Sequence, residues 1–339
     1  MSFSRRFIIF NWITLVAIYL VVVAGSFVRI SGSGMGCPDW PKCFGQWIPP
    51  TDSTVLPKDY KEIYLEKREK KVEKFSIFLA NVGFKDEANQ LKNDPSVYVE
   101  ENFNARKTWT EYINRLLGFL AGNFMLVSFL WMFLAYRKSG LLLVSLANLI
   151  LMGIEAWFGS IVVATNLVPW TITIHMLLAL IIIAVQTFVL YRVSPMLQRK
   201  IVVPKWLKTS VWLIFLITFY QMFLGTQVRE DIDALVKKGF SREEWIESLG
   251  LPFFIHRSFS WLVLIGLSFI AWKNEKTYKI KLIRGAYLIL AIELISGVML
   301  AYADMPGFIQ TSHLIFASVL FGILWIAILR FKSQKSPHK

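Results

Sequence analysis

Three histidines and one asparagine occupy corresponding places near the ends of apolar stretches in this 339-residue sequence. Each lies within about two helical turns of such an end: they are His175, His256, His313 and Asn114. A lone histidine in an apolar layer often only hydrogen-bonds between helices, but three at one depth favour a ligand role, because ionisable groups are costly there. Because a neutral imidazole commonly binds metals, we expect these histidines to bind a metal, and His256 and His313 are the strongest candidates for metal ligands.

The apolar stretches that carry these residues predict a polytopic membrane protein. Hydrophobic residues make up 55% of the chain, aromatic residues 15%, and the mean hydropathy is +0.51, far from a soluble protein. Each stretch is long enough to cross a hydrocarbon layer of roughly 30 Å as a helix. The eight predicted spans are 7–28, 116–135, 139–165, 167–191, 209–228, 251–272, 285–303 and 308–329. We interpret the first as an uncleaved span rather than a signal peptide.

Charge in the connections predicts the orientation of the chain. The connections on the N-terminal side of the membrane carry most of the excess lysine and arginine and a single acid, Glu275. This bias predicts both termini in the cytoplasm, and we expect the plasma (inner) membrane of a bacterium. The net charge of +14 is explained by these basic connections, so it does not indicate nucleic acid as a partner. His338 belongs to the polar C-terminal tail and needs no further explanation.

The sequence also repeats itself. "EAWFG" at 155–159 and "ELISG" at 293–297 both read glutamate, three residues, glycine, and in both a histidine follows the glutamate at the same interval. "GSFVR" at 25–29 and "GTQVR" at 225–229 likewise keep a glycine, a valine and an arginine in register. Internal similarity over matching spans predicts that the two halves have the same architecture.

This repeat makes Asn114 the counterpart of His256. Because each half holds an even number of spans, both halves have the same orientation. We expect an all-α membrane fold of two tandem, parallel-repeat four-helix bundles, in residues 1–195 and 205–339. The first half is longer because of one external insertion at about 50–105, whose charge pattern predicts one or two amphipathic helices solvated on one face. We interpret the insertion as a decoration without chemistry.

Two imidazoles on facing helices suit a haem iron, whereas a free metal ion would need more donors. His256 and His313 therefore predict a bis-histidine haem site in the second half. The equivalent pair in the first half is Asn114 with His175, and an amide is a poor iron ligand, so one axial position is expected to be open or weakly filled. A six-coordinate haem suits electron transfer, and a site with one histidine suits a haem that is bound as a substrate and released.

The charged residues near these ligands each allow two interpretations. Glu111, one helical turn before Asn114, is either a proton acceptor beside a reacting porphyrin or an acid at the membrane interface. Four arginines near span ends either bind haem propionates or anchor helices: they are Arg29, Arg115, Arg229 and Arg257. Glu155 and Glu293, like Gln221, either hydrogen-bond a ligand histidine or tie helices together.

Two cysteines lie in the first external loop, "GSGMGCPDWPKCFGQW". Cys37 and Cys43 are predicted to lie outside the cytoplasm, where a disulfide is stable, and the rigid Pro38 and Pro41 lie between them. A structural staple and a redox role both remain open. Zinc is not expected, because no external histidine is near enough to complete four ligands.

These motifs together resemble the haem A synthase family. The resemblance rests on "GSGMGCPDWPKC" after the first span, "EYINR" opening the second, "GSIVVATNLVPWTITIH" across the third and fourth, "HR" opening the sixth and "TSH" in the eighth. It covers all spans and omits the 50–105 insertion and the 230–250 loop. It implies a membrane oxidoreductase that converts a ring methyl of haem O to a formyl group by successive hydroxylation, giving haem A for terminal oxidases. It also implies a substrate haem in the N-terminal bundle and a haem B in the C-terminal bundle.

The resemblance further implies roles for individual residues. Glu111 matches the family's acid before its first histidine, His175 the second histidine, His256 and His313 the haem B ligands, and Cys37 with Cys43 the external pair. Asn114 departs from the family, which has a histidine there; we expect activity to be retained because Glu111, Arg115 and "RLLG" are intact. A haem O synthase and terminal oxidase assembly are implied as partners. A membrane electron acceptor is expected, because the chain has no nucleotide-binding motif.

Two other functions fit parts of the sequence. A non-enzymatic membrane cytochrome b would only transfer electrons, and it would retain haem B without modifying a porphyrin. A transporter would use Glu155 and Glu293 in a proton path and would hold no stoichiometric haem. The asymmetry between Asn114 and His256 argues against the first, and the positions of the histidines argue against the second.

Overall fold

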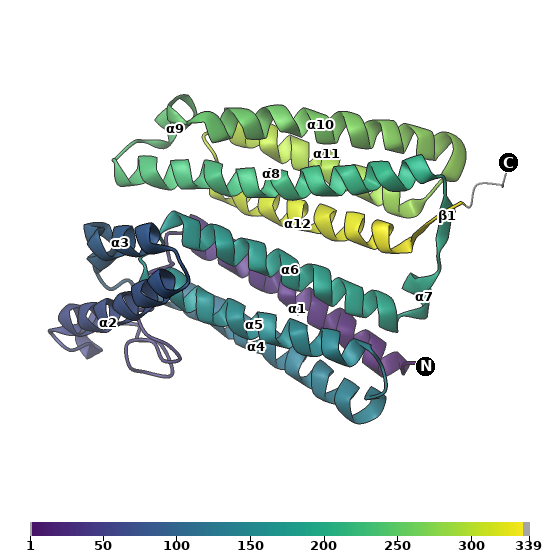
Figure 1. Cartoon of the computed structure of the whole chain (residues 1–339). Helices are drawn as coiled ribbons and strands as arrows, with labels where there is room; N and C mark the ends of the chain where they lie inside the picture. The colour runs from purple at the N-terminus through teal and green to yellow at the C-terminus, as the bar shows by residue number, and fades with distance from the viewer. Residues whose placement is uncertain (1, 335–339) are drawn as a thin grey trace. The chain divides into compact units, whose positions relative to one another are not determined.

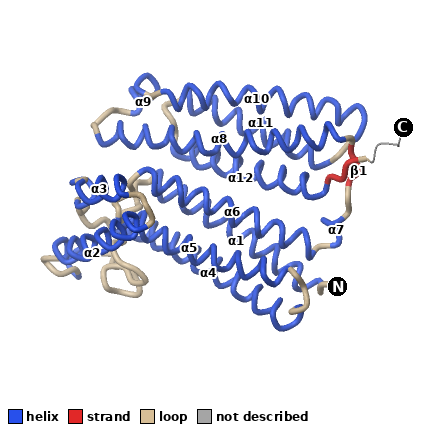
Figure 2. The backbone as a smooth tube through the Cα atoms, in the orientation of Figure 1, coloured by secondary structure: helices blue, strands red, loops and turns tan. Residues whose placement is uncertain are grey.

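A computed structural model describes residues 2–334 of the chain. His338 and the last lysines of the basic tail, Lys335 and Lys339, lie outside the described residues. Within residues 2–334 the structure is almost entirely helical, as Figure 2 shows.

Eight helices of the described chain are long and apolar enough to cross a membrane. They are α1 (Arg5–Ile30), α4 (Ala105–Tyr136), α5 (Leu141–Ala164), α6 (Pro169–Val193), α8 (Lys205–Lys237), α10 (Leu251–Lys273), α11 (Lys281–Tyr302) and α12 (Gly307–Arg330), all drawn in Figure 1. Each corresponds to one predicted span. The prediction of an all-α, multi-pass membrane protein is therefore confirmed.

Two of these helices extend well beyond the apolar stretches. α4 begins about three turns before its predicted span, and α8 continues through the charged segment after Arg229. α8 continues because Val228, Ile232 and Leu235 repeat at helical spacing and are buried against the short helix α9 (Arg242–Ser248). A hydropathy pattern marks where the apolar layer ends, not where the helix ends.

Several short elements connect the long helices. The π-helical turn η3 (Asn274–Tyr278) follows α10, and α7 (Pro195–Gln198) follows α6. Strands β1 (Ile201–Val203) and β2 (Phe331–Ser333) pair in parallel, with Ile201 opposite Phe331. This pairing ties the connection between the two halves of the sequence to the segment that follows α12.

The chain forms two compact units. One comprises residues 20–126 and 149–179, and we call it the cysteine-loop unit because it contains both cysteines. The other, which we call the C-terminal unit, comprises the described residues before 20, residues 127–148 and the described residues from 180 on. This division passes through α1, α4, α5 and α6. The predicted domains, 1–195 and 205–339, follow the sequence repeat instead and stay a prediction.

The C-terminal unit has an apolar core where α8, α10, α11 and α12 meet. All four helices contribute deeply buried side chains to it, such as Leu207, Leu267, Ile283 and Leu324. A buried polar cluster lies elsewhere in this unit, where Asn11 Oδ1 accepts hydrogen bonds from Ser128 Oγ at 3.0 Å and from Gln186 Nε2 at 3.2 Å. In an apolar layer such side chains must satisfy one another.

The insertion contains the 3₁₀ turns η1 (Ser53–Val55) and η2 (Pro95–Tyr98) and the helices α2 (Tyr60–Asn81) and α3 (Lys85–Asn93). The prediction of one or two amphipathic helices is confirmed. The apolar face of α2 is covered by the ends of α5 and α6, where Val72 and Phe75 pack against Phe158 and Ile161 in the cysteine-loop unit. The insertion is therefore an integral part of that unit's core.

Candidate functional site

The two histidines of the second half face each other in the C-terminal unit. His256 lies in the second turn of α10 and His313 in the second turn of α12. Their ring centroids are 6.4 Å apart and the ring planes are inclined at 76°. The two imidazoles thus come from different helices and converge on one region, as the repeat predicts.

Two side chains of α11 fix the orientation of the His313 ring. Its Nδ1 lies 2.8 Å from Ser296 Oγ and 3.2 Å from Glu293 Oε1. These partners occupy one ring nitrogen and leave Nε2 as the free ligand atom. Ser296 was missed in the sequence analysis because its counterpart in the first half is Phe158, so the repeat gave no signal for it.

His256 is fixed through its backbone. Gln221 Nε2 on α8 donates a hydrogen bond of 2.9 Å to the His256 carbonyl oxygen. The ring lies against Gly225, where a Cβ atom would be 3.5 Å from Cε1. Its Nδ1 is buried and has no hydrogen-bond partner among residues 2–334. Gln221 therefore supports the helix that carries the ligand rather than the imidazole itself.

The distance between the imidazoles fits a metal held between them. A metal bound at about 2 Å from one nitrogen of each ring would separate the ring centroids by about 6 Å, close to the observed 6.4 Å. Nowhere in the described chain do three or more histidine, cysteine or acidic side chains gather so that they could hold a free metal ion. The donor set fits a metal whose other ligands come from a macrocycle such as haem.

The cysteine-loop unit repeats this arrangement with one change. His175 Nδ1 on α6 lies 3.0 Å from Glu155 Oε1 on α5, as His313 does from Glu293. Gly159 lies beside the His175 ring, where a Cβ atom would be 3.1 Å from Cε1. Glu155 and Glu293 thus both lie at the nitrogen that a metal-binding histidine commonly offers to an outer partner.

Asn114 occupies the position that corresponds to His256. It lies on α4 beside Gly25, where a Cβ atom would be 3.8 Å from the Asn114 Oδ1 atom, just as Gly225 lies beside His256. Oδ1 is buried and, within the described residues, no hydrogen-bond donor reaches it. A buried amide oxygen without a donor is costly, so this position is suited to receive a ligand.

Glu111 and Arg115 bind the cysteine loop. Cys37 and Cys43 form a disulfide with a Cα–Cα distance of 5.2 Å, as predicted. Glu111 is 2% exposed and accepts a 2.7 Å hydrogen bond from the Cys37 backbone N–H. Arg115 pairs with Glu111 and donates to the Asp39 carbonyl and, at 2.5 Å, to the Cys37 carbonyl. The two side chains hold the loop on α4; a proton-acceptor role for Glu111 stays a prediction.

The other predicted arginines have different surroundings. Arg229 pairs with Asp233 at 2.9 Å and donates to Gln310. Arg257 is exposed, and its guanidinium lies 5.6 Å from the ring centroids of Phe253 and Phe254. Arg29 is half-buried in the last turn of α1. Their predicted binding of propionates stays a prediction.

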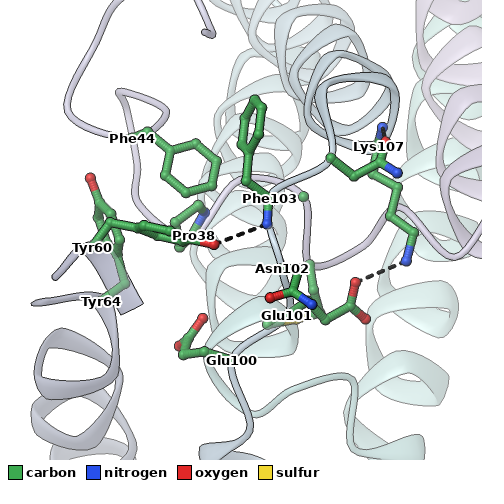
Figure 3. Close-up of a pocket in the computed structure, with 12 residues that line it drawn as sticks. Pro38, Phe44, Tyr60, Tyr64, Glu100, Glu101, Asn102, Phe103 and Lys107 are labelled. Carbon is green, nitrogen blue, oxygen red and sulfur yellow. Dashed lines mark hydrogen bonds and ion pairs between the residues drawn. The ribbon is translucent and has the colours of Figure 1, made fainter. Parts of the chain in front are cut away.

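A small pocket lies between the cysteine loop and the insertion (Figure 3). It is lined by aromatic rings such as Phe44, Tyr60 and Phe103 and by polar groups such as Glu101, which pairs with Lys107 at 2.9 Å. The Phe103 N–H donates to the Tyr60 hydroxyl at 3.1 Å. None of the predicted iron ligands lines this pocket, so it is separate from the two histidine sites.

Residues 8–325 match the model of the COX15-CtaA family, described as cytochrome oxidase assembly protein. This chain belongs to that family. Among its relatives are proteins named heme A synthase from three Wolbachia sources. That of Wolbachia pipientis wMel is 24% identical over 350 residues, covering 95% of this chain and 92% of the relative. That of Wolbachia pipientis subsp. Culex pipiens (strain wPip) is 22% identical over 343 residues, covering 92% of this chain and 94% of the relative. That of Wolbachia sp. subsp. Brugia malayi (strain TRS) is 23% identical over 345 residues, covering 94% of this chain and 95% of the relative.

Proposed function

We propose that this COX15-CtaA family member is a haem A synthase that oxidises a ring methyl of haem O to a formyl group by successive hydroxylation. The observation that carries the proposal is the repeated pair of sites, each with a histidine beside a glutamate on the preceding helix. Near full-length similarity to relatives named heme A synthase supports the same conclusion. Each two-electron oxidation of the methyl carbon releases two protons, and water supplies the oxygen atom. The electrons pass to a membrane electron acceptor, because the chain itself has no nucleotide-binding motif.

His256 and His313 would hold a haem B in this proposal. The haem, when bound, supplies a one-electron redox centre. Ser296 and Glu293 fix the His313 ring through Nδ1, and Gln221 holds the helix of His256. A ligand that is oriented before binding does not lose further freedom when it binds, which favours a tightly retained cofactor.

Asn114 and His175 would bind the substrate haem. Glu155 lies next to Nδ1 of His175, which leaves Nε2 as the ligand atom. The amide of Asn114 offers a hydrogen-bonding oxygen instead of a second strong iron ligand. A site with only one strong iron ligand would release its product more readily. Glu111, close to this site along α4, is the proposed proton acceptor.

The proposed setting is the bacterial inner membrane with both termini in the cytoplasm. The excess of lysine and arginine in the connections on one side supports this orientation. A haem O synthase would supply the substrate, and terminal oxidase assembly would consume the product.

The experiment that tests this function is extraction and chromatography of the porphyrins bound to the protein, purified from cells that also make haem O. We expect haem A or its hydroxylated precursor together with haem B. Haem B alone would show an electron-transfer cytochrome instead, and a protein without haem would return the transporter to consideration.

A substitution of His313 tests whether this residue is a haem ligand. His313→Ala should abolish the low-spin haem B spectrum while the protein still inserts into the membrane, because one axial ligand is lost. Ser312→Ala, at the neighbouring residue, is the matched control and should keep the spectrum. An unchanged spectrum in His313→Ala would remove His313 from the proposed ligands.

A further inference from the structure

The insertion places one basic residue of α2 in an unusual environment. The helix carries many charged side chains, and nearly all are exposed: Lys61, Glu62, Glu66, Lys67, Glu69, Lys70, Glu73 and Lys74. Only Arg68 and Lys71 are not. Both lie on the inward face of α2, with Val72 and Phe75, because residues three and four apart share one side of a helix.

Arg68 has a full set of partners. Its guanidinium donates to the carbonyl oxygens of Val97 and Val99, each at 3.1 Å, and pairs with Glu100 at 2.9 Å. These contacts fold the end of the insertion back onto α2. Its burial is thereby explained by structure alone.

The partial burial of Lys71 is not explained by partners of this kind. No carboxylate of the described chain forms an ion pair with the Lys71 amine. Burial lowers the pKa of Lys71, and the positive charge of nearby Arg115 lowers it further. The charge of Arg115 is already matched by Glu111. One positive charge is therefore left over in a half-buried place, which is costly unless an anion joins it.

Two observations place this charge at the end of the cysteine-loop unit that holds Asn114 and His175: the electrostatic effect of Arg115 on Lys71 and the packing of Phe75. On one side, Arg115 directly follows Asn114 on α4. On the other side, Phe75, one turn after Lys71, packs against the rings of Phe158 and Trp170, with centroids 6.3 and 6.2 Å apart. Phe158 is adjacent to Gly159, which lies against His175. Figure 1 shows α2 lying at that end of α5 and α6.

We infer that Lys71 binds a carboxylate of the porphyrin substrate, so that the insertion takes part in substrate binding. This inference rests on the proposed function, because it takes haem O as the molecule bound beside Asn114 and His175. A porphyrin held by its iron in the apolar layer needs cations where its propionates reach the polar edge. Lys71 supplies a point charge with three donors, whereas the charge of neighbouring Arg115 is matched by Glu111.

The test compares haem O with its dimethyl ester, which keeps the ring and loses the carboxylate charges. Each is titrated into the purified full-length protein already loaded with haem B. Wild type, Lys71→Met, Lys71→Arg and the control Lys74→Met are compared; Lys74 is an exposed lysine one turn further on the same helix. We expect Lys71→Met to weaken haem O binding about tenfold, the usual effect of losing one charge-assisted contact. Binding of the ester should not change, Lys71→Arg should restore most of the affinity, and Lys74→Met should resemble wild type.

The outcomes separate this inference from the function on which it rests. If wild type binds haem O but Lys71→Met weakens haem O and its ester equally, or neither, Lys71 does not bind the carboxylate. If Lys71→Met changes only the amount of anionic phospholipid that copurifies, the ligand is a lipid phosphate and the inference is wrong. If wild type binds no haem O, the proposed function fails first.

Discussion

Gly159→Ala tests whether the glycine beside each ligand is required for the ligand's position. A methyl group at residue 159 would lie 3.1 Å from Cε1 and 3.5 Å from Nε2 of His175. Carbon atoms prefer separations of about 3.5–4.0 Å, so the imidazole must move by several tenths of an ångström. Such overpacking costs about 1–3 kcal/mol, against a gain of about 0.5–1 kcal/mol for alanine in a helix. The expected net loss of stability is about 1 kcal/mol.

The displacement should also disturb the site. His175 Nδ1 is 3.0 Å from Glu155 Oε1, and moving the ring away from α5 lengthens this contact. We therefore expect Gly159→Ala to lower both the thermal unfolding temperature in detergent and the haem O content measured by extraction. The haem B content should stay the same, because the His256 and His313 pair belongs to the other unit.

Two matched variants make this result interpretable. Gly153→Ala lies on the same helix, with no atom within 4 Å of the added methyl, so it should be neutral or stabilising. Gly297→Ala adds a methyl 3.4 Å from Cε1 of His313, an ordinary contact, and should have a smaller effect than Gly159→Ala. If Gly159→Ala is as stable as Gly153→Ala and keeps its haem O, the steric reasoning is refuted.

Three further variants test other parts of the site. Ser296→Ala removes the 2.8 Å contact to His313 Nδ1 and should weaken haem B binding about tenfold by titration; unchanged affinity would show that Glu293 alone orients the ring. Asn114→His should add a second low-spin haem signal in the optical spectrum, and a spectrum like wild type would show that the amide does not keep that site open. Gly36→Ala would place a methyl 2.5 Å from the Lys107 carbonyl carbon, so it should detach the cysteine loop from α4 and expose the disulfide to reductant; Gly118→Ala, with open space around it, is the control.

The sequence predicts the parts of this site that recur. The paired histidines and glutamates could be found because the two halves repeat them at one interval, and the structure brings each glutamate to its histidine. The eight spans could be found because an apolar layer imposes length and composition on every helix that crosses it. Both the repeat and the apolar spans can be recognised from the order of residues alone.

What could not be predicted depends on contacts between segments distant in the sequence. The sequence allowed Glu111 to be a proton acceptor or an interfacial acid, but it gave no sign that the Cys37 N–H, 74 residues away in the chain, donates to its carboxylate. In the sequence Lys71 is one charge among many in the insertion, and its position follows only from the packing of Phe75 against Phe158. The repeat gives no sign of Ser296, because the corresponding residue in the first half is Phe158, whose side chain cannot form a hydrogen bond. A helical period shows which face of α2 is apolar, but not what covers that face.

The attachment of the cysteine loop to α4 has a consequence for how its sequence can vary. α4 contacts the loop mainly through main-chain atoms: the N–H and carbonyl of Cys37 and the carbonyls of Asp39 and Gly36. Every residue type offers a backbone carbonyl at these positions, and every type except proline offers the N–H. Substitutions that preserve the loop's path should therefore be tolerated, even though the loop lies beside a site whose side chains are tightly constrained. We expect relatives to diverge in the side chains of this loop while keeping its position, provided that Gly36, the disulfide and the α4 side chains that bind the loop remain: Thr108, Glu111, Tyr112 and Arg115.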